Sequence, residues 1–118
     1  MEEQYIQLIE DLERVITKAK KAITDSHSLL LLYTVSDEYG ITVKDIRSPR
    51  RDRPIADARV IYAHIMHARY NATIAHIAKK LSKHHSSVIA MLKRYKDFID
   101  TDAGFSTHVD NVLNKIED

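Results

Sequence analysis

The chain has 118 residues, of which 44% are hydrophobic, enough for one domain with a single modest core. It contains no cysteine, which excludes a disulfide framework and a thiolate zinc site, and nothing in its composition requires an oxidising compartment. The longest apolar run, Leu29 to Tyr33, is too short to span a bilayer, and the acidic N-terminus lacks the basic region of a signal peptide, so we expect a soluble cytoplasmic protein without a membrane partner.

The N-terminal residues, Glu2 to Thr24, predict a long amphipathic helix. Its apolar positions alternate at spacings of four and three residues, the heptad pattern of a helix seam: Tyr5, Ile9, Leu12, Ile16, Ala19 and Ile23, flanked by Leu8, Val15 and Ala22. Acidic residues lie towards the start of this segment and lysines towards its end, as the helix dipole favours. Three heptads are short for a coiled coil, so we expect this helix to pack against the rest of the chain, with a dimer seam as the alternative.

A second helix and a basic loop follow. Asp25, Ser26 and Ser28 are typical helix caps and predict a new helix that starts there and runs to about Tyr39, with Gly40 at its C-terminal end. The Thr-x-x-Asp pattern at residues 42–45 is typical of a capping box and predicts a short helical turn. Residues 47–54 contain four arginines and two prolines, which predicts a basic loop without regular structure.

The remaining segments are also helical. Pro54 suits the first turn of a helix that runs from Ile55 to about Tyr70 and ends at Asn71. Residues 73–96 predict two short helices joined by a tight polar connection, the outline of a helix-turn-helix, with Thr73 as the first N-cap. We expect four residues of its second helix to face the core: Val88, Ile89, Leu92 and Tyr95. Residues 105–116 predict a final amphipathic helix, and no segment alternates like a strand, so the expected fold is all-α.

Charge is distributed unevenly along the chain. The whole chain has a formal net charge of +1, but residues 41–96 hold 13 basic and three acidic residues, a net charge of +10. The remaining residues hold five basic and 14 acidic ones, a net charge of −9. A basic block inside acidic flanks indicates a face for a polyanion, whereas the alternative is a scatter of solvated surface charges.

The helix-turn-helix and the basic loop are the candidate functional sites. In such a motif the first helix crosses the phosphate backbone and the second enters the major groove. The His-Ser-Ser segment at residues 85–87 can reach bases or phosphates, and its serines can equally cap the helix. Arg50, Arg51 and Arg53 resemble an arm that inserts arginine into a minor groove, with a solvated loop as the alternative.

Metal binding and catalysis are not indicated. His64 and His67 lie three residues apart on one predicted helix, and His84 and His85 are adjacent, but no carboxylate completes a recognisable ligand set nearby. Two glycines are too few for a Gly-rich phosphate loop, and no spacing suggests a nucleophile with its base. We therefore expect no metal, no cofactor and no enzymatic activity.

Several motifs occur in the order of a known family. Residues 39–46, Tyr-Gly-Ile-Thr-Val-Lys-Asp-Ile, look like the family's segment before its basic loop. Residues 50–53, followed by Ile55, Ala56 and Arg59, resemble its Arg-Arg-x-Arg loop and the start of the next helix, and residues 74–77 resemble the start of its helix-turn-helix. Residues 83–88 stand where the family has Arg-Asp-His-Ser/Thr-Thr-Val. From about residue 30 to 99, the sequence thus resembles the C-terminal DNA-binding domain of the bacterial replication initiator DnaA.

This resemblance implies a Trp-repressor-like helical fold with double-stranded DNA as its partner. The helix-turn-helix would read the major groove of a short box, and Arg53 would enter the adjacent minor groove. The full set of DNA-binding residues expected is Arg50, Arg51, Arg53, Arg59, Lys83, His84, His85, Ser86, Ser87 and Lys93. His84 replaces the family's aspartate, so a carboxylate acceptor is missing there, and the turn at residues 82–83 is shorter than usual and lacks glycine.

We expect two parts, an N-terminal amphipathic helix at residues 1–26 and a DnaA C-terminal-like helix-turn-helix domain at residues 27–118. The ATPase module that precedes this domain in full initiators does not occur in the sequence. The expected function is that of a stand-alone, sequence-specific DNA-binding protein on the nucleoid, acting in replication initiation, its regulation or transcription. The alternative is a helical interaction module that forms a homodimer or binds an initiator through residues 2–24.

Overall fold

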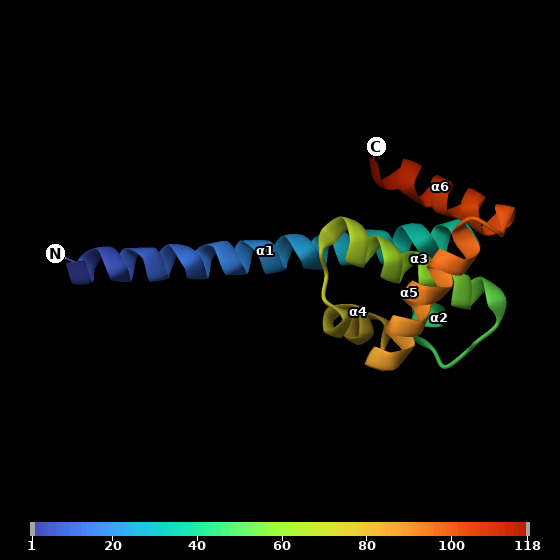
Figure 1. The fold of residues 1–118 in the computed structure, drawn as a ribbon, viewed down its shortest axis with the longest axis horizontal. Coiled ribbons are helices and arrows are strands. Elements are labelled where there is room, and N and C mark those ends of the chain that lie inside the picture. Colours follow the sequence, from blue (N-terminus) through green and yellow to red (C-terminus); the bar gives the residue numbers. More distant parts are fainter. Residues whose placement is uncertain (1, 118) are drawn as a thin grey trace.

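The computed structural model describes residues 2–117, which fold into six α-helices (Figure 1). The helices are α1 (Glu2–Tyr39), α2 (Val43–Arg47), α3 (Arg53–Tyr70), α4 (Ile74–Leu81), α5 (His85–Ile99) and α6 (Ala103–Glu117). Residues 2–117 contain no β-strand, which confirms the expected all-α fold. None of the described helices combines the length and the apolar character needed to cross a membrane.

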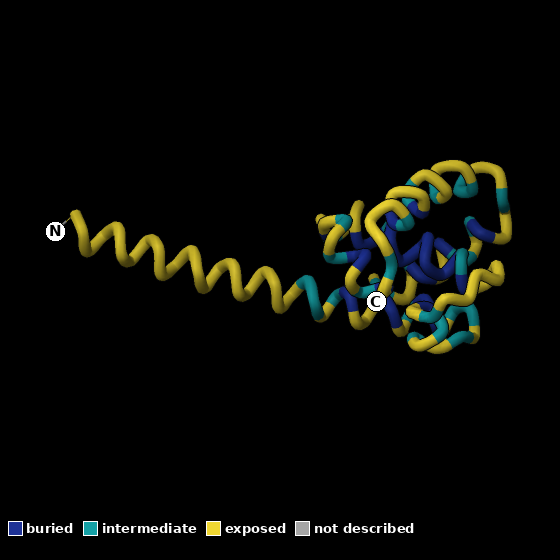
Figure 2. Tube along the Cα trace, turned by 90° about the horizontal axis from the view of Figure 1, so that it is seen from below, coloured by how far each residue is buried: buried dark blue, intermediate teal, exposed yellow. Residues whose placement is uncertain are grey.

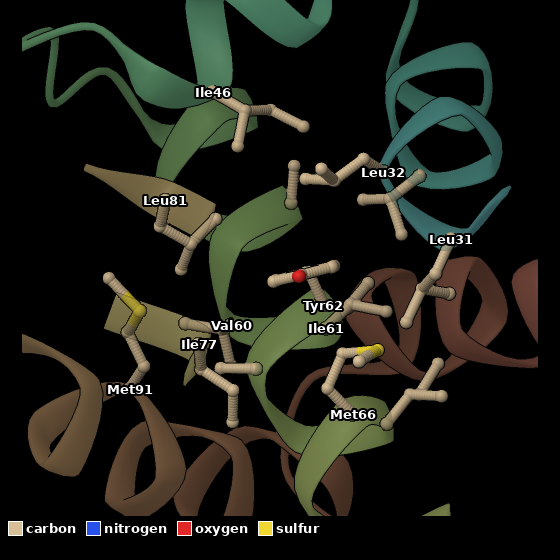
Figure 3. Packing of buried hydrophobic residues seen from close by; sticks show 14 of the residues in the cluster. Leu31, Leu32, Ile46, Val60, Ile61, Tyr62, Met66, Ile77, Leu81 and Met91 are labelled. Atoms are coloured by element: carbon tan, nitrogen blue, oxygen red, sulfur yellow. The ribbon is translucent and has the colours of Figure 1, made fainter. Parts of the chain in front are cut away.

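Helix α3 lies at the centre of the fold and packs against α1, α2, α4 and α5. It begins after the N-cap Asp52, with Pro54 in its first turn, where a missing backbone N–H costs no helical hydrogen bond. Its middle is buried almost all the way round, as in a core helix: Val60, Ile61, Tyr62, Ala63, Ile65 and Met66. Neighbouring helices complete this core with the residues labelled in Figure 3: Leu31, Leu32, Ile46, Ile77, Leu81 and Met91.

Backbone geometry confirms three predicted helix ends. Gly40 has a φ of 64°, the left-handed conformation that glycine adopts cheaply after a helix. The Thr42 hydroxyl accepts a hydrogen bond from the Asp45 N–H (3.0 Å), and the Asp45 carboxylate accepts one from the Thr42 N–H (3.1 Å), which completes the predicted capping box. Asn71 ends α3 with a φ of 56°. The connection from α2 to α3, residues 48–52, is the basic loop.

The expected start of a new helix at residues 25–28 is wrong, because α1 continues unbroken from Glu2 to Tyr39. Side chains that cap a helix must bind its backbone N–H groups, but two of these bind other helices instead. The Ser28 hydroxyl lies 2.5 Å from the Tyr62 hydroxyl of α3, and the Asp25 carboxylate pairs with Lys80 of α4 (3.5 Å). The expected boundary at residue 26 therefore falls inside one helix, and residues 1 and 118 of the expected parts lie outside the described residues.

The N-terminal half of α1 does not pack against the rest of the chain, so that expectation is also wrong. Every residue from Glu2 to Ile23 is exposed, and this half extends away from the other helices (Figure 2). Among residues 2–39, the first buried one is Ser28. Residues 2–23 extend for about 33 Å at the rise of an α-helix. The molecule is therefore elongated, with principal-axis extents of 61, 31 and 26 Å.

Candidate nucleic-acid interface

Helices α4 and α5 form the predicted helix-turn-helix. The hydroxyl of the N-cap Thr73 accepts a hydrogen bond from the backbone N–H of His76 (3.1 Å). After α4, Ser82 takes a φ of 56°, a left-handed conformation that favours glycine, and the N–H of Lys83 donates to the Ala78 carbonyl (2.9 Å). The connection between the two helices therefore consists of residues 82–84 alone.

The start of α5 faces solvent, as the reading end of such a motif must. His84 is the N-cap, and its ring nitrogen Nδ1 accepts a hydrogen bond from the Ser86 N–H (3.2 Å). His85 and Ser86 are exposed, and Ser87 is half-buried. Within residues 2–117 the side chains of His85 and Ser87 make no hydrogen bond. The capping role that we considered for the serines is thus carried by His84, whose Nδ1 also lies 2.9 Å from the Ser86 hydroxyl, while the side chains of His85 and Ser87 are available to a ligand.

One inward residue of α5 differs from the prediction. Val88 is buried and Leu92 and Tyr95 are partly buried as expected, but Ile89 is 44% exposed and Met91 is buried in its place. Successive residues of a helix are about 100° apart, and Ile89 lies one such step from Val88 towards solvent. It shares a face with His85, four residues earlier, and adds an apolar group to the exposed end of α5.

Two cations hold the basic loop in place. Arg59 of α3 is 4% exposed, and its guanidinium donates to the carbonyl oxygens of residues 46, 48 and 50 at 2.6–2.7 Å. The ammonium group of Lys83 donates to the same Ser48 carbonyl (2.6 Å). Burial lowers the pKa of Arg59, and burial together with the charges of Arg59 and Arg51 lowers the pKa of Lys83. Both side chains are among the residues expected to bind DNA, and in the structure they bind the loop and fix its path.

Arg53, the expected minor-groove arginine, is engaged in ion pairs. It is the first residue of α3 rather than a loop residue. Its guanidinium pairs with Asp57 (3.2 Å) and with Asp102, and it lies over the ring of Phe98. Hydrogen bonds from Arg53 to these two carboxylates raise its pKa. The structure therefore places Arg53 against the start of α6, away from the reading end of α5.

A cationic hollow of about 560 Å³ lies between the basic loop and α5. Nine residues line it: Pro49, Arg51, Ala56, Arg59, Lys83, Ser87, Ala90, Met91 and Arg94. Four of them are positively charged and none is acidic. Arg51 is exposed, and no acidic side chain within residues 2–117 pairs with it, whereas Arg50 pairs with Asp52 (3.1 Å) and does not line the hollow. The hollow thus joins the two candidate sites into one surface.

Arg94 also lines this surface, although it is not among the residues expected to bind DNA. It lies seven residues after Ser87, two helical turns along the same face of α5, and this spacing is the signal that would have found it. Lys93, which the resemblance places at DNA, is exposed and does not line the hollow.

The histidines considered as metal ligands are arranged differently from a metal site. The ring of His64 stacks on the ring of Tyr95, with centroids 3.4 Å apart. Burial, followed by the neighbouring His67 and Lys96, lowers the pKa of His64. Within residues 2–117 no three His, Asp or Glu side chains lie close enough together to hold a metal ion. In this structure His64 is a packing residue between α3 and α5.

The exposed start of α5, the short turn and the adjoining cationic hollow define a helix-turn-helix DNA-binding domain. Residues 30–94, more than half of the chain, match the family described as bacterial dnaA protein helix-turn-helix. The chain belongs to this family, which confirms the resemblance seen in its motifs.

Similar curated proteins carry the name chromosomal replication initiator protein DnaA. The one from Mycoplasma capricolum is 30% identical over 112 residues, which cover 94% of this chain and 24% of the relative. The one from Aliarcobacter butzleri is 29% identical over 87 residues, which cover 73% of this chain and 20% of the relative. The chain therefore spans a fifth to a quarter of the length of these relatives.

Proposed function

We propose that these 118 residues by themselves bind double-stranded DNA at specific sequences and act in replication initiation, in its regulation or in transcription. The observation that supports this most directly is the cationic hollow, because it joins the start of α5 to the basic loop. Arg51, Lys83 and Arg94 supply positive charge on both of its sides. Such a surface suits the phosphate backbone between a major groove and the neighbouring minor groove. This activity would associate the protein with the nucleoid.

In this proposal the start of α5 enters the major groove. His85 and Ser86 are exposed there and can hydrogen-bond to base edges, while Ile89 can contact a thymine methyl group. Ser87 faces the hollow and suits a phosphate at the helix N-terminus. The ring of His84 serves as the N-cap and offers no carboxylate acceptor, so the preferred bases should differ from those that an aspartate at this position would select.

The basic loop supplies the second contact. We assign the minor groove to Arg51, because it is exposed and unpaired among the described residues, whereas Arg53 would first have to leave Asp57 and Asp102. A narrow minor groove concentrates negative potential and so attracts arginine. Arg50 and Lys93 are exposed and suit phosphates on either side. Arg59 positions the loop by holding its carbonyl groups.

Selection of bound duplexes from a random pool would identify the target, on which the variants are then compared by fluorescence anisotropy. Arg51→Ala and His85→Ala are each expected to cost about 1–3 kcal/mol of binding free energy. An arginine that contacts a phosphate or a groove releases counterions on binding. Its loss should therefore also reduce the slope of log affinity against log salt concentration by about one. Arg53→Ala is expected to change affinity less, because this guanidinium is held by two carboxylates.

A matched control is Arg14→Ala, which removes the same charge from the exposed half of α1. This variant should leave both the affinity and the salt dependence unchanged. If wild type, Arg51→Ala and His85→Ala bound the selected duplex equally well, the site assignment would be wrong. If the pool yielded no preferred sequence, sequence specificity would be refuted. The affinity for DNA as such would still be measured on a random duplex.

A second function, an interaction module, is favoured by the exposed apolar seam of α1. Residues 2–24 would bind a second copy or an initiator, and the globular part would not contribute to this contact. Deletion of these residues should remove any association seen by light scattering and leave DNA binding intact, because residues 2–23 are exposed throughout. Loss of DNA binding on deletion would contradict this separation of roles.

A further inference from the structure

We propose that the N-terminal halves of α1 from two copies of the chain pair in antiparallel orientation along residues 5–23. This inference goes beyond DNA binding and does not depend on it. It starts from eight large apolar side chains that are each 51–66% exposed: Tyr5, Ile6, Leu8, Ile9, Leu12, Val15, Ile16 and Ile23. An amphipathic helix gains most of its stability by packing this face, and a contiguous exposed apolar surface marks an interaction site.

The exposed face has a heptad register with two unlike edges. Its centre is formed by two alternating sets: Ile9, Ile16 and Ile23 at one core position, and Tyr5, Leu12 and Ala19 at the other. One edge, the residues just before each isoleucine, is apolar: Leu8, Val15 and Ala22. The opposite edge, the residues just after the second set, is mostly charged: Ile6, Glu13 and Lys20.

These edges favour antiparallel over parallel pairing. In a parallel pair the apolar edge of each helix meets the charged edge of the other, which would set Leu8 against Glu13 and Val15 against Lys20. In an antiparallel pair each edge meets its own counterpart. The apolar edges are then buried against each other on one side, while the two mostly charged edges lie beside each other on the other side, where water reaches them.

The charges along α1 favour the same orientation. Residues 2–13 contain five acidic residues and no basic one, whereas residues 14–21 contain four basic residues and no acidic one. An antiparallel pair centred near Arg14 places each acidic segment beside the basic segment of the other copy. A parallel pair would place like charges side by side, which costs energy even where the charges are solvated.

This centre also fits the free length of the helix. It produces layers of Tyr5 with Ile23, Ile9 with Ala19, and Leu12 with Ile16, and each layer occurs twice by symmetry. Residue 2 of the second copy then lies level with residue 26, just before Ser28, where α1 enters the globular core. The pair therefore uses the exposed half of α1 in full and leaves the core contacts of the other half untouched.

The orientation can be measured directly on the full chain. Because the chain has no cysteine, Gln4→Cys creates a unique site for a spin label at an exposed position near the N-terminus. In the antiparallel pair two such labels are separated by about 30 Å along the helix axes. In a parallel pair they lie side by side. Light scattering should give the mass of two chains, and pulsed electron paramagnetic resonance should give the longer separation.

The seam itself is tested by replacing its two central residues. Leu12→Gln combined with Ile16→Gln is expected to give a monomer, and its globular part should unfold as in wild type because both side chains are exposed. The matched control, Gln7→Ala with Thr17→Ala on the polar face, should stay dimeric.

Three results would overturn the proposal. The first is the mass of one chain, or of more than two, for the wild-type protein. The second is a dimer that persists in the Leu12→Gln, Ile16→Gln variant. The third is a short separation between the labels at position 4, which would show parallel pairing. None of these measurements involves DNA, so they test the pairing of α1 separately from the DNA-binding proposal.

Discussion

The C-terminal half of α1 buries Leu31, Leu32 and Val35 against the globular part of the chain, whereas the N-terminal half leaves Leu12 and Ile16 more than half exposed. Both halves belong to one continuous helix and both are amphipathic. The C-terminal half is covered by α3 and α6, and within residues 2–117 nothing covers the other half. The two halves thus share a sequence pattern and differ in whether other helices pack against their apolar face.

This difference shows what hydrophobic periodicity reports. Apolar residues at helical spacing identify the face that gains from leaving water, at about 1.5–3 kcal/mol for a fully buried leucine. They do not identify the group that covers it, which depends on the path of the remaining chain or on another molecule. In α1 that gain is realised within the chain only from Ser28 onwards.

The largest test of the comparison is a pair of identical substitutions, Leu32→Ala and Leu12→Ala. Leu32 is buried in the core beside α3, so its truncation is expected to lower the free energy of unfolding by about 2–5 kcal/mol. Leu12 is exposed, so the same truncation should change it by less than about 0.5 kcal/mol in dilute, monomeric protein. Chemical denaturation measures both. Similar losses at the two positions would show that the N-terminal half is covered after all.

A smaller effect is expected where the two halves meet, at Ser28. Its hydroxyl lies 2.5 Å from the hydroxyl of Tyr62, and both residues are buried. Ser28→Ala should cost about 1–3 kcal/mol of unfolding free energy, because it leaves the Tyr62 hydroxyl buried without a partner. Ser28→Ala combined with Tyr62→Phe should recover part of that loss. A double-mutant cycle measures the coupling, and strictly additive losses would contradict it.

Local signals predicted much of the fold. Thr42, Gly40 and Thr73 end or begin helices where the sequence placed those events, because caps depend on residues only a few positions apart. The break expected near Asp25 and Ser28 failed for the opposite reason. Their side chains bind α3 and α4, partners that are distant in the sequence and cannot be recognised from a local pattern.

In the candidate site, too, the features set by local sequence were predicted and those set by distant partners were not. The helix-turn-helix and the basic loop followed from spacing and charge, and the structure brings them together at the cationic hollow. The separation of the arginines by role did not follow, because it depends on carbonyl and carboxylate partners set by the fold. Arg59 binds one carbonyl of α2 and two of the basic loop, and Arg53 binds Asp102 of a later segment. Arg51 differs from both only through the absence of such partners among residues 2–117.

The smallest expected effect concerns the far end of α1, where Glu38 attaches this helix to α6. Its carboxylate accepts hydrogen bonds from Asn111 (2.8 Å) and Lys115 (3.1 Å) and lies 3.1 Å from Nδ1 of His108. Burial alone would raise the pKa of Glu38, but these three hydrogen bonds outweigh it, so the pKa lies below its ordinary value. The contact therefore stabilises the ionised form of the carboxyl group.

A lowered pKa in the folded state fixes the direction of the pH dependence. The stabilisation by Glu38 is complete above its unfolded-state pKa of about 4.3 and is lost as the pH falls through the folded-state pKa. Glu38→Gln is expected to lower the unfolding free energy by about 0.5–1 kcal/mol at neutral pH and to flatten its decline in acid. Chemical denaturation between neutral and acidic pH measures this, with Asp37→Gln as the exposed neighbour that should change less. If wild type and Glu38→Gln lost stability in parallel on acidification, ionisation of Glu38 would not contribute to the pH dependence, and this contact would add nothing to the apolar core that holds the C-terminal half of α1 in place.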